Sequence, residues 1–214
     1  MKKPEKIIPL FKVHMHKDVV SSVSDTLLSG YIGEGPKVIE FENALMKYLD
    51  CENLITTNSA TSAIHLAISM IKRLPIGDDW VGIEDGDEVL TTPLTCTATN
   101  FPILANNMNI KWVDIDLETC NLNMDDLENK LSKKTKIIMA VHWGGYPIDL
   151  DRIKQIQEKC LKLYGFKPRV IEDCAHGFGT KYKEKHFGNH ENYCCYSFQA
   201  IKHLTTVDGG ALVL

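Results

Sequence analysis

Short β-prone runs and longer helical stretches alternate along most of this chain, and this alternation limits the possible fold more than any other feature. The strands predicted from apolar, β-prone runs cover residues 54–57, 88–91, 110–115, 136–141 and 169–171. Helical periodicity covers the intervening residues 61–73, 97–106, 124–132 and 149–164. Such alternation is typical of an α/β fold with a mainly parallel sheet flanked by helices. Ligand sites in these sheets gather at the carboxyl ends of the strands.

The charge and cysteine content exclude several classes of protein. A net charge of -4 gives no reason to expect a nucleic acid or an anionic membrane as a partner. No apolar run approaches the length of a membrane span. The 7 cysteines are scattered, and no secretory signal precedes them, so we expect reduced thiols and a cytoplasmic protein.

The segment from Arg169 to Gly210 carries the residues that point to a specific chemistry. A buried strand is predicted to end in two carboxylates, Glu172 and Asp173, and such carboxylates favour a cationic partner. Lys202 follows among aromatic and β-branched residues, where its amine can attack a carbonyl group. An acid and an amine suit the two ends of pyridoxal 5′-phosphate (PLP), which are a ring nitrogen and an aldehyde.

Several stretches of the sequence together resemble one enzyme family. In chain order they are SGYIGEGPKVIEFE (29–42), NSATSAIHLAI (58–68), GDEVLTTPLTCTATN (86–100), VHWGGYPIDLD (141–151), EDCAH (172–176) and SFQAIKHLTTVDGG (197–210). Their content and order resemble the DegT/DnrJ/EryC1/StrS family of PLP-dependent sugar aminotransferases. The resemblance covers almost the whole chain and implies the type I fold of PLP-dependent transferases.

The resemblance implies a role for several individual residues. Ala60 and Thr61 are expected to hold the PLP phosphate, and Ser197 is expected to add a hydroxyl group. The phosphate would lie at the start of a helix, where backbone N–H groups point at an anion. Asp173 is expected to keep the ring nitrogen protonated, and Lys202 to form the Schiff base and to move protons.

Two positions depart from the pattern of the family. Cys96 stands where relatives place an aromatic residue on the PLP ring, so either Trp143 or His176 covers that face or the cofactor is held more loosely. His176 stands where many members have glutamine, and we expect it to contact the ring face or its O3′ oxygen. A histidine titrates where a glutamine cannot. The nearby Gly144–Gly145 pair predicts a turn, since the dinucleotide fingerprint is absent.

Each of these residues, taken alone, also has an ordinary explanation. Alone, residues 59–62 are more typical of a helix N-cap than of a phosphate site. An acid at a strand end more often binds a loop than a cofactor, and a lone lysine is usually a solvated charge. Adjacent strand residues point to opposite faces, so Glu172 faces away from the site that Asp173 faces. We expect Glu172 to be structural, as a salt-bridge partner. Only the joint occurrence of the motifs favours a cofactor site.

A group of histidines and cysteines near the end of the chain suggests zinc at first sight. The group comprises His186, His190, Cys194 and Cys195. Zinc sites usually space their cysteines as CxxC, and adjacent residues in a strand face opposite ways. We therefore predict no metal site here.

The function expected from the resemblance is amino transfer. The substrates would be a nucleotide-linked 4-keto-6-deoxy sugar and glutamate as amino donor, and the protein would be a homodimer. In this family, histidine in place of the lysine turns transamination into dehydration, so Lys202 favours transamination. The alternatives are a PLP-dependent sugar dehydratase and a non-catalytic truncated relative that acts as a binding or regulatory protein.

We expect the chain to have two parts. Residues 1–30 form an N-terminal segment with a helix at 17–29, and residues 31–214 form the PLP-binding large domain, in which Pro36 opens a second helix. The chain stops within a predicted strand at 210–214. The resemblance therefore implies an incomplete large domain and an absent small C-terminal domain.

Overall fold

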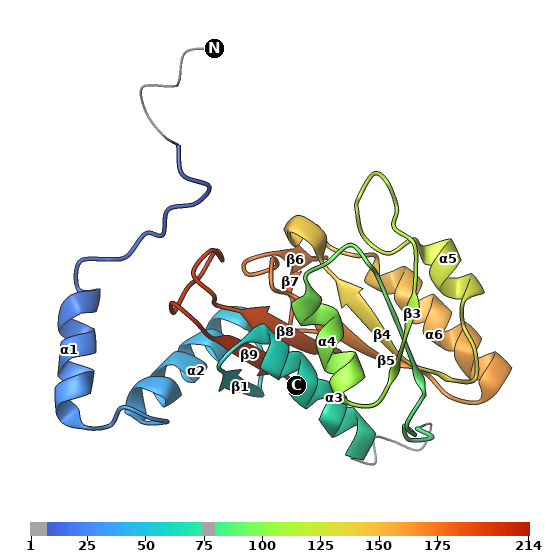
Figure 1. Cartoon of the computed structure of the whole chain (residues 1–214), viewed down its shortest axis with the longest axis horizontal. Coiled ribbons are helices and arrows are strands. Elements are labelled where there is room, and N and C mark those ends of the chain that lie inside the picture. The colour runs from blue at the N-terminus through green and yellow to red at the C-terminus, as the bar shows by residue number, and fades with distance from the viewer. Residues whose placement is uncertain (1–7, 74–79) are drawn as a thin grey trace, which may run out of the picture.

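The computed structural model describes residues 8–73 and 80–214, and every strand and helix predicted from the sequence is present (Figure 1). The helices are α1 (Val19–Ser29), α2 (Pro36–Leu49), α3 (Ala60–Arg73), α4 (Thr97–Ala105), α5 (Met124–Asn129) and α6 (Leu150–Tyr164), with a 3₁₀ turn, η1 (Trp143–Gly145). The strands are β1 (Leu54–Thr57), β2 (Glu88–Thr91), β3 (Asn109–Trp112), β4 (Thr135–Val141), β5 (Arg169–Asp173), β6 (Lys181–Tyr182), β7 (Lys185–His186), β8 (Tyr193–Ser197) and β9 (Gly210–Val213).

The predicted sheet is mainly parallel, as expected. Its seven strands run in the order β1-β9-β8-β5-β4-β2-β3, and β6 pairs with β7 in a separate hairpin. Within this sheet, β3, β2, β4, β5 and β8 are parallel to one another. β9 lies between β8 and β1 and is antiparallel to both. The carboxyl ends of β1 and β8 and the start of β9 therefore meet at the same edge.

Helices cover both faces of the sheet, which accounts for the alternation of buried side chains. In β4, Ile137 and Met139 join a core cluster with α3, whereas Ile138 and Ala140 join a cluster with α6 on the opposite face. α3 and α4 cover the first face, and α2, α5 and α6 cover the second (Figure 1). The fold is a three-layer α/β structure with a core on each side of the sheet.

Two elements end earlier than predicted because side chains take over the backbone hydrogen bonds. β3 stops at Trp112, and Asp126 then accepts the N–H of Asp114 at 2.7 Å. α5 stops at Asn129, and the N–H of Ser132 is bound by a threonine hydroxyl at the start of β4. Local polar groups thus compete with regular structure at both sites.

The N-terminal segment lies apart from the sheet. α1 buries none of its residues, and Figure 1 places it to one side of the sheet, beyond α2. Residues 1–7 of the predicted 1–30 segment lie outside the described residues. In the described part of the chain, no helix combines the length and the apolar character that crossing a membrane needs.

The 7 cysteines are free thiols, and two of them are adjacent in β8. Cys194 and Cys195 enter core clusters on opposite faces of the sheet, as adjacent strand residues must. The pair therefore cannot bind one metal ion without distortion of β8.

Candidate active site

A cavity of about 270 Å³ lies at the carboxyl edge of the sheet. It is formed where β1 leads into α3, where β2 leads into α4, at the ends of β5 and β8, and at the start of β9. The seven residues predicted from the sequence all line this cavity: Ala60, Thr61, Cys96, Asp173, His176, Ser197 and Lys202. Segments more than 140 residues apart in the sequence thus contribute to one site.

The lining also includes polar residues that the sequence did not indicate. They are Asn58, Thr95, Thr99, Gln199 and Asp208. Thr95 precedes the N-cap of α4 and Thr99 lies in its first turn, so no helical periodicity in the sequence links the two.

The start of α3 supplies unpaired backbone donors to the cavity. The Ser59 hydroxyl accepts the N–H of Ser62 at 3.2 Å and so caps the helix. The N–H groups of Ala60 and Thr61 belong to the first turn, where no helical carbonyl is available to them. They therefore give this end of the cavity a preference for an anion.

Gly210 allows β9 to approach the start of α3 closely. A Cβ atom at this position would lie 2.4 Å from the carbonyl carbon of Ser59 and 2.6 Å from the amide nitrogen of Ala60. No side chain can be placed there without movement of the backbone. The anion-binding end of the cavity thus depends on a glycine in the neighbouring strand.

Asp173 ends β5 as a buried carboxylate with two donors. Its Oδ2 accepts a hydrogen bond of 2.6 Å from the hydroxyl of Thr99, and its Oδ1 accepts the N–H of Ala175 at 3.0 Å. Only 5% of the residue is exposed. A carboxylate held in this way remains able to bind a further cationic donor from the cavity.

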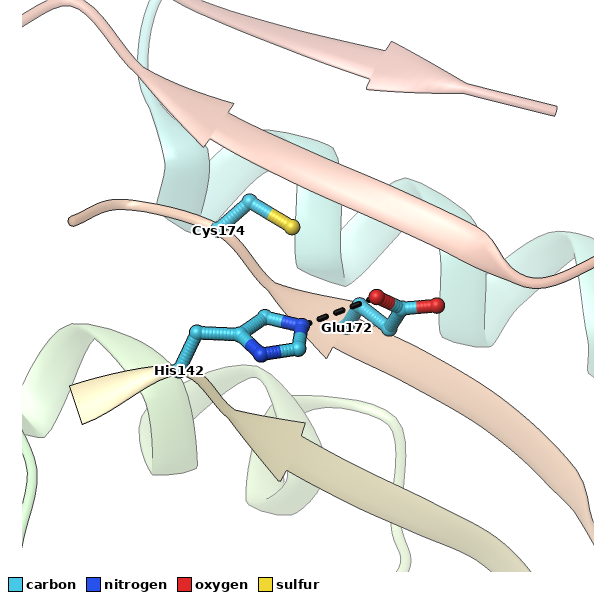
Figure 2. Close-up of side chains that lie close together, drawn as sticks. All are labelled: His142, Glu172 and Cys174. Carbon is cyan, nitrogen blue, oxygen red and sulfur yellow. Dashed lines mark hydrogen bonds and ion pairs between the residues drawn. The ribbon is translucent and has the colours of Figure 1, made fainter. Parts of the chain in front are cut away.

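Glu172 points to the opposite face of β5, as predicted, and binds a histidine. Its Oε2 lies 2.8 Å from Nε2 of His142, which follows β4 (Figure 2). Its Oε1 accepts the side-chain amide of Asn192 at 2.8 Å. Burial alone raises the pKa of Glu172, but these hydrogen bonds outweigh it and lower the pKa below its usual value. Glu172 is therefore a buried structural anion.

The same group includes a cysteine at a distance that a metal ion could bridge. One ligand atom each from His142, Glu172 and Cys174 lies within 4.8 Å of the others (Figure 2). However, Nδ1 of His142 accepts the N–H of Ile148 at 3.2 Å, so the ring carries its proton on Nε2 and donates it to Glu172. Burial also raises the pKa of the Cys174 thiol, which opposes metal binding. We therefore interpret His142 and Glu172 as a hydrogen-bonded pair and not as part of a metal site.

His176 lines the cavity as a neutral imidazole. Burial, followed by the charge of Lys202, lowers the pKa of His176. Its Nδ1 accepts the N–H of Gly144 at 3.3 Å, so the proton lies on Nε2. Trp143 packs edge-on against the His176 ring, with the ring centroids 5.7 Å apart. Of these two candidates for covering the PLP ring, His176 lines the cavity and Trp143 does not.

The predicted turn after β4 fixes this histidine from the other side. Gly144 and Gly145 both have positive φ, and a Cβ on Gly145 would lie 2.7 Å from the carbonyl oxygen of His176. The turn and the histidine can therefore approach only through a glycine backbone.

Lys202 and Cys96 complete the lining from two irregular segments. Lys202 is half-buried in the loop between β8 and β9, where its N–H donates to Gln199 at 2.8 Å. Cys96 is exposed at the N-cap position of α4 and makes no capping hydrogen bond. The thiol gives the cavity a small and weakly polar wall at this point.

Comparison with known proteins identifies the family. Residues 13–214 match the DegT/DnrJ/EryC1/StrS aminotransferase family. The UDP-4-amino-4-deoxy-L-arabinose–oxoglutarate aminotransferase of Shewanella sediminis is 32% identical over 203 residues, which are 95% of this chain and 48% of that protein.

Solved structures of other proteins resemble this chain in sequence and in fold. AtS13 from Actinomadura melliaura is 45% identical with a TM-score of 0.91, over 99% of this chain and 54% of that one. Spr1654 from Streptococcus pneumoniae, assigned as a sugar aminotransferase, is 30% identical in its PLP form with a TM-score of 0.86, over 96% of this chain and 52% of that one.

This chain spans about half the length of these relatives. The type I fold predicted from the sequence is confirmed over that half. Because the family match extends over nearly all of the sequence, the chain belongs to the DegT/DnrJ/EryC1/StrS aminotransferase family.

Proposed function

We propose that this chain is the PLP-binding part of an enzyme that transfers an amino group from glutamate to a nucleotide-linked 4-keto-6-deoxy sugar. The observation that carries the proposal is the single cavity lined by a buried acid, Asp173, an amine, Lys202, and the free N–H groups at the start of α3. The Shewanella relative acts on a UDP-linked amino sugar with oxoglutarate, and the pneumococcal relative has a PLP form.

The residues present fit PLP. At one end, the close approach of Gly210 leaves the first N–H groups of α3 in a narrow cradle suited to a phosphate. We assign phosphate binding to the backbone of Ala60, to the backbone and hydroxyl of Thr61, and to the hydroxyl of Ser197, which ends β8 at the same edge.

Asp173 would bind the protonated ring nitrogen, which its two existing donors leave it free to do. PLP, when bound and protonated there, supplies an electron sink for the carbanion that forms next to the substrate nitrogen. The acid lies in a buried place, where its charge is weakly screened and holds that proton firmly.

Lys202 would bind the aldehyde carbon and then carry protons to and from the substrate as a general base and acid. His176, with its proton on Nε2, would donate to the ring oxygen or cover the ring face. Cys96 forms the wall where an aromatic side chain of the family pattern would stack on the ring, and its small thiol leaves that space open.

We infer that two copies associate, because α1 exposes an apolar surface that includes Val20, Leu27 and Leu28. Analytical ultracentrifugation would detect the dimer, and a monomer at micromolar concentration would contradict it.

Product analysis tests the proposed reaction. The purified chain is loaded with PLP and glutamate and then given a panel of nucleotide-linked keto sugars, and the products are identified by mass spectrometry. We expect an amino sugar and 2-oxoglutarate from the chain, and neither product from Lys202→Ala. Lys181→Ala, which removes an exposed lysine in β6, is the matched control.

Two other outcomes would support the alternatives. A deoxy-keto sugar with released ammonia would identify a dehydratase. A chain that binds no PLP and forms no product would favour a non-catalytic binding or regulatory protein.

A further inference from the structure

We infer that Thr99 is a positioning residue that fixes the Asp173 carboxylate for the ring nitrogen of PLP, with Thr95 fixing the direction of its hydroxyl proton. The inference rests on the proposed function. It starts from the hydrogen bond of 2.6 Å between Thr99 Oγ1 and Asp173 Oδ2, which joins residues 74 apart in the sequence.

The two donors to Asp173 come from different elements. Thr99 belongs to the first turn of α4, and Ala175 belongs to the loop after β5. Each donor binds a different oxygen of the carboxylate, so rotation of the carboxylate would break both hydrogen bonds. Thr99 is 1% exposed, so water cannot replace its hydroxyl without a rearrangement of the helix.

The direction of the threonine hydrogen bonds follows from their chemistry. An ionised carboxylate only accepts, and a hydroxyl has one proton, so Thr99 must donate that proton to Asp173. The oxygen of Thr99 lies 2.7 Å from the hydroxyl of Thr95, which must then donate to Thr99. The order Thr95 to Thr99 to Asp173 is therefore the only one that satisfies all three groups.

This arrangement lets Thr99 act on the cofactor through Asp173. A carboxylate held in one orientation presents a fixed lone pair to the ring nitrogen. The conformational entropy of the Asp173 side chain is then already lost before PLP binds, so binding does not have to offset it. In a Thr99→Val chain the shape is nearly kept, but Oδ2 loses its donor in a buried place. Asp173 would then be free to turn away from the ring.

A double-mutant cycle separates positioning from a general structural role. PLP dissociation constants are measured by absorbance titration for the wild-type chain, Thr99→Val, Asp173→Asn and the double variant. We expect Thr99→Val alone to weaken binding on the order of 10-fold to 100-fold, as loss of a hydrogen bond to a charged group does. In the Asp173→Asn background, Thr99→Val should change the logarithm of the dissociation constant by less than a third of that amount. The reason is that the carboxylate which Thr99 positions is no longer there.

Two single variants serve as controls. Thr99→Ser keeps the hydroxyl and should bind PLP nearly as the wild type does. Thr97→Val removes an exposed hydroxyl on the same turn, outside the cavity lining, and should leave the constant unchanged. An equal loss in both backgrounds, or wild-type binding by Thr99→Val, would overturn the positioning role.

A measurement without PLP keeps this inference apart from the proposed function. In the wild-type chain free of cofactor, NMR should detect the Thr99 hydroxyl proton as a resonance protected from exchange with water, and Thr95→Val should weaken that protection. A wild type that binds no PLP would refute the proposed function and with it the cofactor role of Thr99. An unprotected hydroxyl proton would refute the hydrogen-bond chain itself, whether or not PLP binds.

Discussion

Cys96 decides how well the cavity can hold an aromatic ring. Its side chain is exposed at the N-cap of α4 and lines the cavity, so a larger side chain can extend from the same position. We predict that Cys96→Phe tightens PLP binding by about 2-fold to 10-fold, the range expected from one stacked aromatic pair. Fluorescence titration with PLP measures the change.

The matched control is Thr97→Phe, which adds the same ring one residue further on, outside the lining. This control should bind PLP as the wild type does. Weaker binding by Cys96→Phe than by the control would mean that the ring does not lie against this wall.

Among single residues, those that belong to a sequence motif could be predicted. The seven residues named from the motifs all lie around one cavity, although their individual roles stay predictions. The partnership of Thr99 with Asp173 could not be predicted, because it depends on how α4 crosses the end of β5. The buried pair of Glu172 and His142 escaped notice for the same reason, since two parallel strands bring it together.

Between elements, the contact of β9 with the start of α3 is the tightest constraint near the cavity. We predict that Gly210→Ala lowers PLP affinity at least 10-fold, because its Cβ would push the Ser59–Ala60 backbone away and disturb the first turn of α3. The variant should also unfold at a lower temperature, since the displaced atoms are backbone atoms.

Gly165→Ala tests whether any glycine change has this effect. Gly165 ends α6 with a positive φ of 83° and has open space around it, so its replacement strains the chain far from the cavity. We expect lower thermal stability with unchanged PLP affinity. If Gly210→Ala bound PLP normally, the cradle would not depend on this contact.

The order of elements could be predicted from periodicity, but the direction of the last strand could not. The parallel strands β2, β3 and β4 were placed correctly from their apolar runs, because each is followed by a helix that returns the chain. β9 follows a loop instead, so it turns back antiparallel between β8 and β1, and no residue pattern in 210–213 reveals that choice. The predicted end of β3 was wrong, because the N–H of Asp114, just beyond the strand, donates to the side chain of Asp126 and not to a neighbouring strand.

For the whole molecule, two half-buried histidines predict how the free energy of unfolding depends on pH. Burial lowers the pKa of His176 and of His190. Below about pH 6.5 the unfolded chain therefore binds more protons at these positions than the folded chain does. The free energy of unfolding should thus fall as the pH drops below 6.5.

Glu172 acts in the same direction at lower pH. Its lowered pKa contributes stability that is present above about pH 4.5 and is lost as the pH falls further. Urea titrations between pH 8 and pH 4 measure the combined effect. His176→Gln should have a shallower slope between pH 7 and pH 5.5 than the wild type, whereas substitution of an exposed histidine, His14→Gln, should not. An equal slope in all three chains would contradict the burial argument.

The proposed function depends on the amine of Lys202 in the cavity, and covalent trapping of PLP tests that dependence most directly. The chain is incubated with PLP, reduced with borohydride, digested and mapped by mass spectrometry. We predict that the added mass appears on the peptide that contains Lys202 and is lost in Lys202→Ala. Mass added to a different lysine, or PLP bound without any modification of Lys202, would contradict the account.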